Sequence, residues 1–370
     1  MARFPYFSCI RSSKGETGGP SEIKHASTDH GRLLSISRTE TVKSDQPKYL
    51  RCVANAPESK ELVVTTNTAD PECVLGEGRL GRVYKGYLDS GQEVAVKWFD
   101  ELADLSEEVQ MLCSIDHPNI IKMIAYCDEG KDRVIVFEFM PLRSLNLHLR
   151  DLEPGKTPLD WNTRMKIAEG VAKALEYLHD QNDPPVIYSG LKSTSILLDE
   201  NYNPKLSDFG CARHGPLWNY RSIHEKLVRG YGYIGLEYII TEVLTLKSDV
   251  FGFGVILLEL ISGEKAVKES IRGSGKHSLV SWAQPLLDNE NFQDIVDPLM
   301  KGQYPYAGLV KALYLAKMCV KEEAHERPPI AEVVITLSKI NSQIYEEPQV
   351  TTVADPSTLP NIMHHAQAVA

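Results

Sequence analysis

The sequence predicts an α+β domain with two lobes, the first built mainly from strands and the second from helices. Residues 93–99 and 134–140 are apolar runs of strand length, and the first alternates with period two. A break follows at 141–145, and beyond it apolar residues recur at helical spacing. We therefore expect strands before this break and helices after it, in two lobes that the break connects.

The segments on either side of this domain lack any sustained hydrophobic period. Residues 1–60 are rich in Ser, Thr, Lys and Arg, with ten basic and six acidic side chains. Residues 346–370 contain three prolines, Pro348, Pro356 and Pro360. Because such segments cannot bury enough apolar surface to fold alone, we expect a disordered, mildly basic tail at 1–60 and a second disordered tail at 346–370.

Composition excludes several classes of protein. The net charge of -10 and the pI near 5.6 disfavour a nucleic-acid binder, which needs a basic face. The seven cysteines are scattered and contain no C-x-x-C pair, so neither a disulfide framework nor a zinc site is predicted, and a reducing cytosol fits best. No apolar run reaches the roughly 18 residues of a membrane span.

Cys9 is a candidate for S-palmitoylation, because aromatic and aliphatic residues surround it and Arg3 and Arg11 flank them. The alternative is a free thiol on the tail. A single lipid chain anchors weakly, so at most a peripheral association with the membrane is expected.

The glycine-rich stretch from Leu75 matches G-x-G-x-x-G-x-V through Gly76, Gly78, Gly81 and Val83. Glycines let backbone amides approach nucleotide phosphates, although a plain hairpin turn has a similar pattern.

The strand at 93–99 contains Val-Ala-Val-Lys, and its alternation places Ala95 and Lys97 on one face. This pairing suits an apolar contact with adenine beside an ammonium that reaches the phosphates, whereas an isolated strand lysine is usually a solvated surface residue. The helix expected after it contains Glu107 and Glu108, and Glu108 is favoured as the partner of Lys97 because it precedes an apolar run; the alternative is an exposed helical glutamate.

In the C-lobe, Asp160 is the expected N-cap of a helix with a buried apolar face. The runs at 251–261 and 330–340 are expected to be a buried helix and the last amphipathic helix. Between them and the first helix lie the stretch 188–195 and the tripeptide Asp208-Phe209-Gly210.

These motifs occur in an order that resembles that of protein kinases. Their amino-acid sequences resemble those of plant receptor-like cytoplasmic kinases of subfamily VII. The resemblance runs from about Glu61 to Tyr345 and is carried by FEFMPL at 137–142, LDWN at 159–162, PPVIY at 184–188, PKLSDFG at 204–210 and LKSDV at 246–250.

This resemblance implies a small β-rich N-lobe at about 61–140, a larger helical C-lobe at about 141–345 and a nucleotide cleft between them. Phe137 would be the gatekeeper, Glu138 and Met140 would lie on the hinge, and Asp208 would be a metal ligand. The residues expected to bind ATP are Leu75, Gly76, Gly78, Val83, Ala95, Lys97, Glu108, Glu138, Met140, Leu197 and Asp208. Asp249 would brace the catalytic loop, and Glu237 would pair with Arg327.

The departures from the family pattern lie where the chemistry occurs. Gly190 replaces the catalytic Asp, Ser195 replaces the metal-binding Asn, and Ser189 replaces an Arg that grips a phosphorylated activation loop. Gly230 replaces the substrate-facing Thr, and the activation loop carries Ser-Ile-His-Glu-Lys at 222–226. Lys192 is retained, and the helix that bears Glu108 is expected to start late.

Without an intact catalytic set, the expected function is that of a pseudokinase acting as a signalling scaffold or regulator. Loss of general-base catalysis costs on the order of 10²–10⁴ in rate. The alternative is a weakly active serine/threonine protein kinase that transfers the ATP γ-phosphate to proteins.

The resemblance implies ATP as a ligand with weak Mg²⁺ binding through Asp208. It also implies a role in plant immunity, with receptor kinases, active cytoplasmic kinases or immune receptors as partners. The expected location is cytoplasmic, with plasma-membrane association through the N-terminal tail.

Overall fold

The computed structural model describes residues 48–54, 61–68, 70–78, 81–100, 105–129, 132–150, 152, 155–215, 231–241, 243–269 and 276–343. The chain divides into two compact units, Met1–Lys43 and Ser44–Ala370, and all described residues belong to the second. Cys9, the segments 222–226 and 346–370, and Gly230 lie outside the described residues. Among those that are described, no helix has the length and apolarity needed to cross a membrane.

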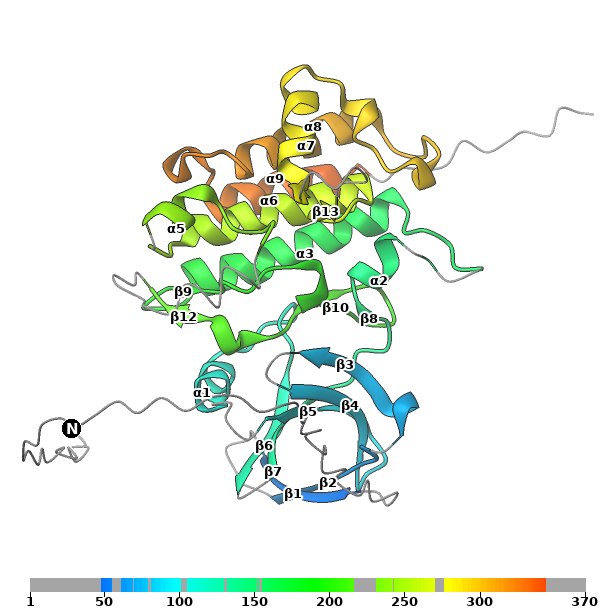
Figure 1. Cartoon of the computed structure of the whole chain (residues 1–370), viewed down its shortest axis with the longest axis vertical. Helices are drawn as coiled ribbons and strands as arrows, with labels where there is room; N and C mark the ends of the chain where they lie inside the picture. Colours follow the sequence, from blue (N-terminus) through cyan, green and yellow to red (C-terminus); the bar gives the residue numbers. More distant parts are fainter. Residues whose placement is uncertain are drawn as a thin grey trace, which may run out of the picture. The chain divides into compact units, whose positions relative to one another are not determined.

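The N-lobe is rich in strands, as predicted, and the structure shows that they form a curled antiparallel sheet (Figure 1). Its order is β2-β1-β6-β7-β5-β4-β3, and an additional pairing joins β2 to β4. Six strands therefore close into a ring, and β3 is attached to β4 beside it. The strands are β1 Lys48–Ala54, β2 Glu61–Thr66, β3 Val74–Gly78, β4 Gly81–Leu88, β5 Glu93–Phe99, β6 Met123–Glu129 and β7 Asp132–Glu138.

The predicted boundary of the tail at residue 60 is corrected by β1. This strand pairs with β2 along most of its length and with β6 at its end, which closes the ring. Leu50 and Cys52 are buried inside it, with exposed fractions of 3 % and 1 %. The strand β1 could not be predicted from the sequence, because it has few buried positions and they lie in a segment of polar, basic composition.

One short helix, α1 Ser106–Ser114, packs against the sheet. Val109, Met111 and Leu112 are buried, and the helix also contacts the single turn Phe209–Cys211 of the C-lobe. This short helix fits the expectation that the element carrying Glu108 starts late.

The C-lobe is built around α3 Trp161–Asp180 and α6 Leu246–Ser262, which contact each other. Asp160 caps α3 as predicted, since its carboxylate accepts a 2.7 Å bond from the Thr163 N–H. The run at 251–261 lies within α6 and is buried. The other helices in the described part of the C-lobe are α2 Asn146–Leu149, α5 Leu236–Thr241, α7 Leu279–Asp288, α8 Tyr306–Cys319 and α9 Ile330–Asn341.

The short strands β8, β9, β10 and β12 lie at the edge of the C-lobe that faces the N-lobe, which is its lower edge in Figure 1. β9 leads into the stretch 188–195, and β10 and β11 form a sheet with β8. β12 pairs with β9, and β13 with β14. Their bounds are β8 Arg143–Ser144, β9 Val186–Ile187, β10 Ile196–Leu198, β11 Pro204–Leu206, β12 Arg213–His214, β13 Val267–Glu269 and β14 Lys276–Ser278.

Candidate functional site

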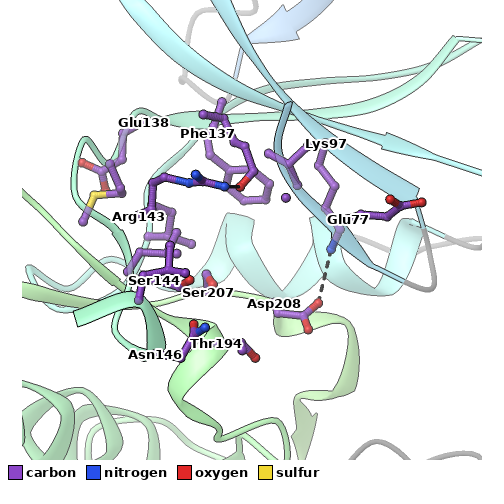
Figure 2. A pocket seen from close by; sticks show the side chains of 18 of the residues that line it. Glu77, Lys97, Phe137, Glu138, Arg143, Ser144, Asn146, Thr194, Ser207 and Asp208 are labelled. Carbon is purple, nitrogen blue, oxygen red and sulfur yellow. Dashed lines mark hydrogen bonds and ion pairs between the residues drawn. The ribbon is translucent and has the colours of Figure 1, made fainter. Parts of the chain in front are cut away.

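A cleft of about 430 Å³ lies between the two lobes, a size typical of small-molecule sites. Of the residues expected to bind ATP, all except Gly78 line it. Gly78 instead ends β3, where it pairs with Gly81 of β4. Figure 2 shows the lining side chains from both lobes around one open space.

The alternation of β5 positions the upper wall of the cleft. Val94 and Val96 are fully buried inside the strand ring, so Ala95 and Lys97 point to the opposite face and line the cleft. Phe137 of β7 pairs with Ala95 and lines the same wall. These positions are those expected of adenine contacts and a gatekeeper.

The side chain of the hinge residue Glu138 is bonded to other parts of the protein. Its carboxylate accepts 2.8 Å bonds from the Lys122 N–H and the Lys205 ammonium. The charged group therefore joins the two lobes and is already occupied by these donors.

Lys97 and Glu108 are brought together by the packing of α1. The Lys97 ammonium donates to both Glu108 oxygens at 2.9 and 2.8 Å, and the Glu108 side chain is 1 % exposed. Glu107 points elsewhere and contacts Arg213. The choice of Glu108 over its neighbour therefore agrees with the geometry.

The charges in the cleft stabilise one another. Burial lowers the pKa of Lys97, but the carboxylates of Glu108 and Asp208 outweigh it and raise the pKa overall. Burial raises the pKa of Asp208, but the ammonium groups of Lys97 and Lys192 outweigh it and lower the pKa overall. Burial also raises the pKa of Glu108, against the opposing effect of Lys97. Lys97 is therefore cationic and Asp208 anionic at neutral pH.

The stretch 188–195 keeps a well-bonded backbone. Asp249 of α6 accepts bonds from the N–H groups of Tyr188 at 2.7 Å and Ser189 at 2.8 Å, so it braces the loop as expected. The Ser195 hydroxyl lies 3.0 Å from the Gly190 carbonyl and 2.9 Å from that of Lys192, where it donates back into the loop.

Two positions of the same loop, Gly190 and Ser195, present no side-chain group to the cleft. Gly190 has no side chain, so nothing at this position can accept a proton from a substrate hydroxyl. A Cβ built there lies 3.5 Å from the Asp208 carbonyl, which is ordinary contact, so the fold does not forbid a side chain. Ser195 is 1 % exposed, and its hydroxyl serves the loop and not the cleft.

The residues present do not fit a divalent cation held by the protein. Asp208 is one carboxylate, and its two oxygens face Lys97 at 3.4 Å and Lys192 at 3.5 Å. Mg²⁺ takes six oxygen ligands, in nucleotide sites usually from one or two carboxylates, phosphates and water, and Asp208 alone gives the protein one carboxylate to offer. Within the described residues, no group of three or more His, Cys, Asp or Glu could hold a metal ion.

Arg143 is a residue of the cleft that the sequence did not indicate. Its Nη2 donates a 2.6 Å bond to the Leu75 carbonyl, so it links β8 of the C-lobe to β3 of the N-lobe. Its backbone is in the left-handed region with φ of 62°, which is costly for a residue with a Cβ. Figure 2 shows this guanidinium reaching across the cleft. No motif distinguishes it from other residues of the connector.

The comparison with protein families matches residues 70–337 to protein tyrosine and serine/threonine kinases. Three similar proteins come from Arabidopsis thaliana. The probable serine/threonine-protein kinase PBL7 is 48 % identical over 319 residues, 84 % of this chain and 83 % of that protein. The serine/threonine-protein kinase PBL27 is 44 % identical over 352 residues, 90 % and 68 % of the two chains. The serine/threonine-protein kinase PBS1 is 49 % identical over 294 residues, 78 % and 64 %.

Proposed function

Because the chain belongs to the protein tyrosine and serine/threonine kinase family, we propose that it binds ATP in the cleft and acts as a pseudokinase. In this role it is a signalling scaffold or regulator that transfers no phosphate at a useful rate. The observation that carries the proposal is the combination of an intact Lys97–Glu108–Asp208 set with a catalytic loop that has no acceptor at Gly190.

The physical argument separates binding from chemistry. Kinases generally use ATP with Mg²⁺, and their catalysis consists mainly of positioning and electrostatic stabilisation. Lys97 can still attract phosphates, whereas the missing base at Gly190 lowers the rate on the order of 10²–10⁴. The hydroxyl of Ser195 is directed into the loop, which removes a second contribution to charge stabilisation.

The names of the relatives favour a second candidate, an active serine/threonine protein kinase, over the pseudokinase. In this chain such a kinase would act weakly, through Lys97, Lys192 and Asp208. The conformation of α1, with Glu108 against Lys97, also suits it.

A transfer assay with radiolabelled ATP separates the two candidates. The chain is incubated with Mg²⁺ or Mn²⁺ and a generic protein substrate, beside the variant Lys97→Met. We expect no label above that of the variant. Label that depends on Lys97 would replace the pseudokinase with the kinase.

We also propose where partners bind and of what kind they are. Apolar side chains are exposed on α5 and the turn before it, by 53 % at Tyr231, 46 % at Leu236 and Ile239 and 71 % at Ile240. A groove beside them is lined by Glu322 and Glu323 and by two lysines, Lys317 and Lys321, whose charges are paired with Asp288 and Glu326, so the net charge at its rim is negative. An apolar patch with an acidic rim suits a basic, apolar surface on a partner, which we place among receptor kinases, cytoplasmic kinases or immune receptors.

Pull-down from plant tissue tests the partner proposal, with the captured proteins identified by mass spectrometry. The variant Ile240→Asp is expected to lose kinases that the unchanged chain captures. Equal capture by the Ile240 variant would exclude the α5 surface as the partner site.

Removal of residues 1–47 tests whether the tail, with Cys9, directs the protein to the plasma membrane. This truncation keeps β1 in place.

A further inference from the structure

We propose that the cleft binds the nucleotide triphosphate as a free anion, without a divalent cation, and that Lys192 supplies the charge that a metal would supply. This inference rests on the proposed binding of ATP and specifies the form of the ligand.

Two ammonium groups converge on one carboxylate at the phosphate end of the cleft. Lys97 lies 3.4 Å from one oxygen of Asp208, and Lys192 lies 3.5 Å from the other. Lys97 reaches this point from β5 in the N-lobe, and Lys192 from the loop in the C-lobe. Phosphate oxygens placed beside Asp208 therefore meet a cation from each lobe.

The two lysines differ in what else holds them. Lys97 is tied to Glu108 by two short bonds, so part of its charge is already neutralised. Within the described part of the chain, Lys192 forms an ion pair with Asp208 alone. Its side chain is 32 % exposed. Lys192 therefore has the greater capacity to bind an added anion.

A divalent cation has little reason to enter this arrangement. It would have to displace an ammonium from Asp208, and the remaining ammonium groups would repel it. The hydroxyl of Ser195 points into the loop, and Gly190 provides no oxygen from a side chain. Fewer ligands and more positive charge both lower the affinity for a metal.

The glycine-rich strand supplies room for the phosphates from above. Gly76 lines the cleft, and a Cβ built on it meets nothing within 4 Å. The backbone of β3 can therefore approach an anion closely.

Calorimetric titration of the full chain with ATP tests this inference, once in excess EDTA and once in Mg²⁺. We expect the two dissociation constants to agree within about threefold. Binding at least tenfold tighter in Mg²⁺ would overturn the metal-free mode and keep the proposed ATP binding. No binding in either buffer would instead overturn the proposed ATP binding.

The variant Lys192→Ala tests the role of the lysine. Loss of a hydrogen bond to a charged group weakens binding about ten- to a hundredfold, and we expect this loss in EDTA. Lys311→Ala removes the same charge from an exposed position on α8 and is expected to leave affinity unchanged. Lys192→Arg keeps the charge and should retain most of the affinity. Unchanged affinity in Lys192→Ala would contradict the proposal.

Asp208→Asn separates an ammonium site from a metal site. A metal site loses its carboxylate and binds ATP more weakly. In the proposed site the two ammonium groups lose a competitor for the phosphates, so binding in EDTA is expected to be at least as tight as in the unchanged chain. Weaker binding of this variant in EDTA would overturn the inference, provided that its melting temperature without ligand is unchanged.

Discussion

Gly190 leaves space in the catalytic loop that neighbouring side chains do not fill. A Cβ there meets the Tyr188 ring at 3.6 Å and the Asp208 carbonyl at 3.5 Å, both ordinary contacts. Asp249 holds the backbone on one side, and the Ser195 hydroxyl on the other. The loop thus keeps its course through bonds that Asp249 and Ser195 make to its main chain.

The double variant Gly190→Asp with Ser195→Asn tests whether these two positions alone account for the low phosphoryl-transfer rate that we propose. We expect the chain to fold, because a Cβ at position 190 makes only ordinary contacts, and to transfer little phosphate to a protein substrate. Ser189, Gly230 and the short α1 remain unsuited to the reaction in this variant. A radiolabelled-ATP assay gives the answer, and robust transfer would show that the other departures matter less than we infer.

Arg143 combines a strained backbone with a contact across the cleft. The left-handed region costs a residue with a Cβ roughly 1–2 kcal/mol, and glycine avoids this cost. We expect Arg143→Gly to be more stable than Arg143→Ala by about 1 kcal/mol, because both lose the bond to Leu75 and only alanine keeps the strain. Urea denaturation measures the difference. A more stable alanine variant would contradict the left-handed conformation.

At the scale of elements, α5 is fixed to the C-lobe by a buried ion pair. Glu237 accepts two 2.7 Å bonds from Arg327, whose side chain is fully buried. A Cβ at Gly235 would lie 2.1 Å from the Glu237 carboxylate, so the glycine makes room for the pair. The predicted pairing of Glu237 with Arg327 is confirmed.

Removal of one partner from this pair should be costly. Glu237→Ala leaves the Arg327 charge buried without its carboxylate, and we expect a loss of about 3–5 kcal/mol in the free energy of unfolding. Glu326→Ala removes the exposed partner of Lys321 and should change stability little. Chemical denaturation of both variants gives the comparison. Similar losses would show that the Glu237–Arg327 pair contributes no more to stability than an exposed ion pair.

The strand β1 is the second element whose role can be tested. Leu50→Ala removes a buried side chain from the strand ring, and we expect a loss of about 2–5 kcal/mol. Leu299→Ala, at a position that is 46 % exposed, is the control and should cost under about 1 kcal/mol. If Leu50→Ala is as mild as its control, the folded domain begins after β1.

At the scale of the whole molecule, the parts that the sequence predicted are those with strong periodicity or fixed spacing. The two lobes follow from the change of hydrophobic period, and the face shared by Ala95 and Lys97 follows from strand alternation. Glu108 was chosen over Glu107 from the apolar residues beside it, and α1 buries it accordingly.

The parts that the sequence did not predict depend on contacts between distant segments. β1 has a pattern too short to stand out, and its place is decided by pairing with β2 and β6. Arg143 lies in a connector, and its contact with Leu75 exists only when the lobes meet. The positions of Lys192 and Lys97 around Asp208 likewise arise from the closed cleft.

The fate of bound ATP tests the central claim most directly. An excess of the chain is incubated with γ-labelled ATP, and the label is then separated into intact ATP, free phosphate and phosphorylated protein. We expect ATP to be bound by the unchanged chain, lost from Lys97→Met, and recovered intact. Label on protein that requires Lys97 would show that the loop with Gly190 still supports phosphoryl transfer, and would contradict the claim.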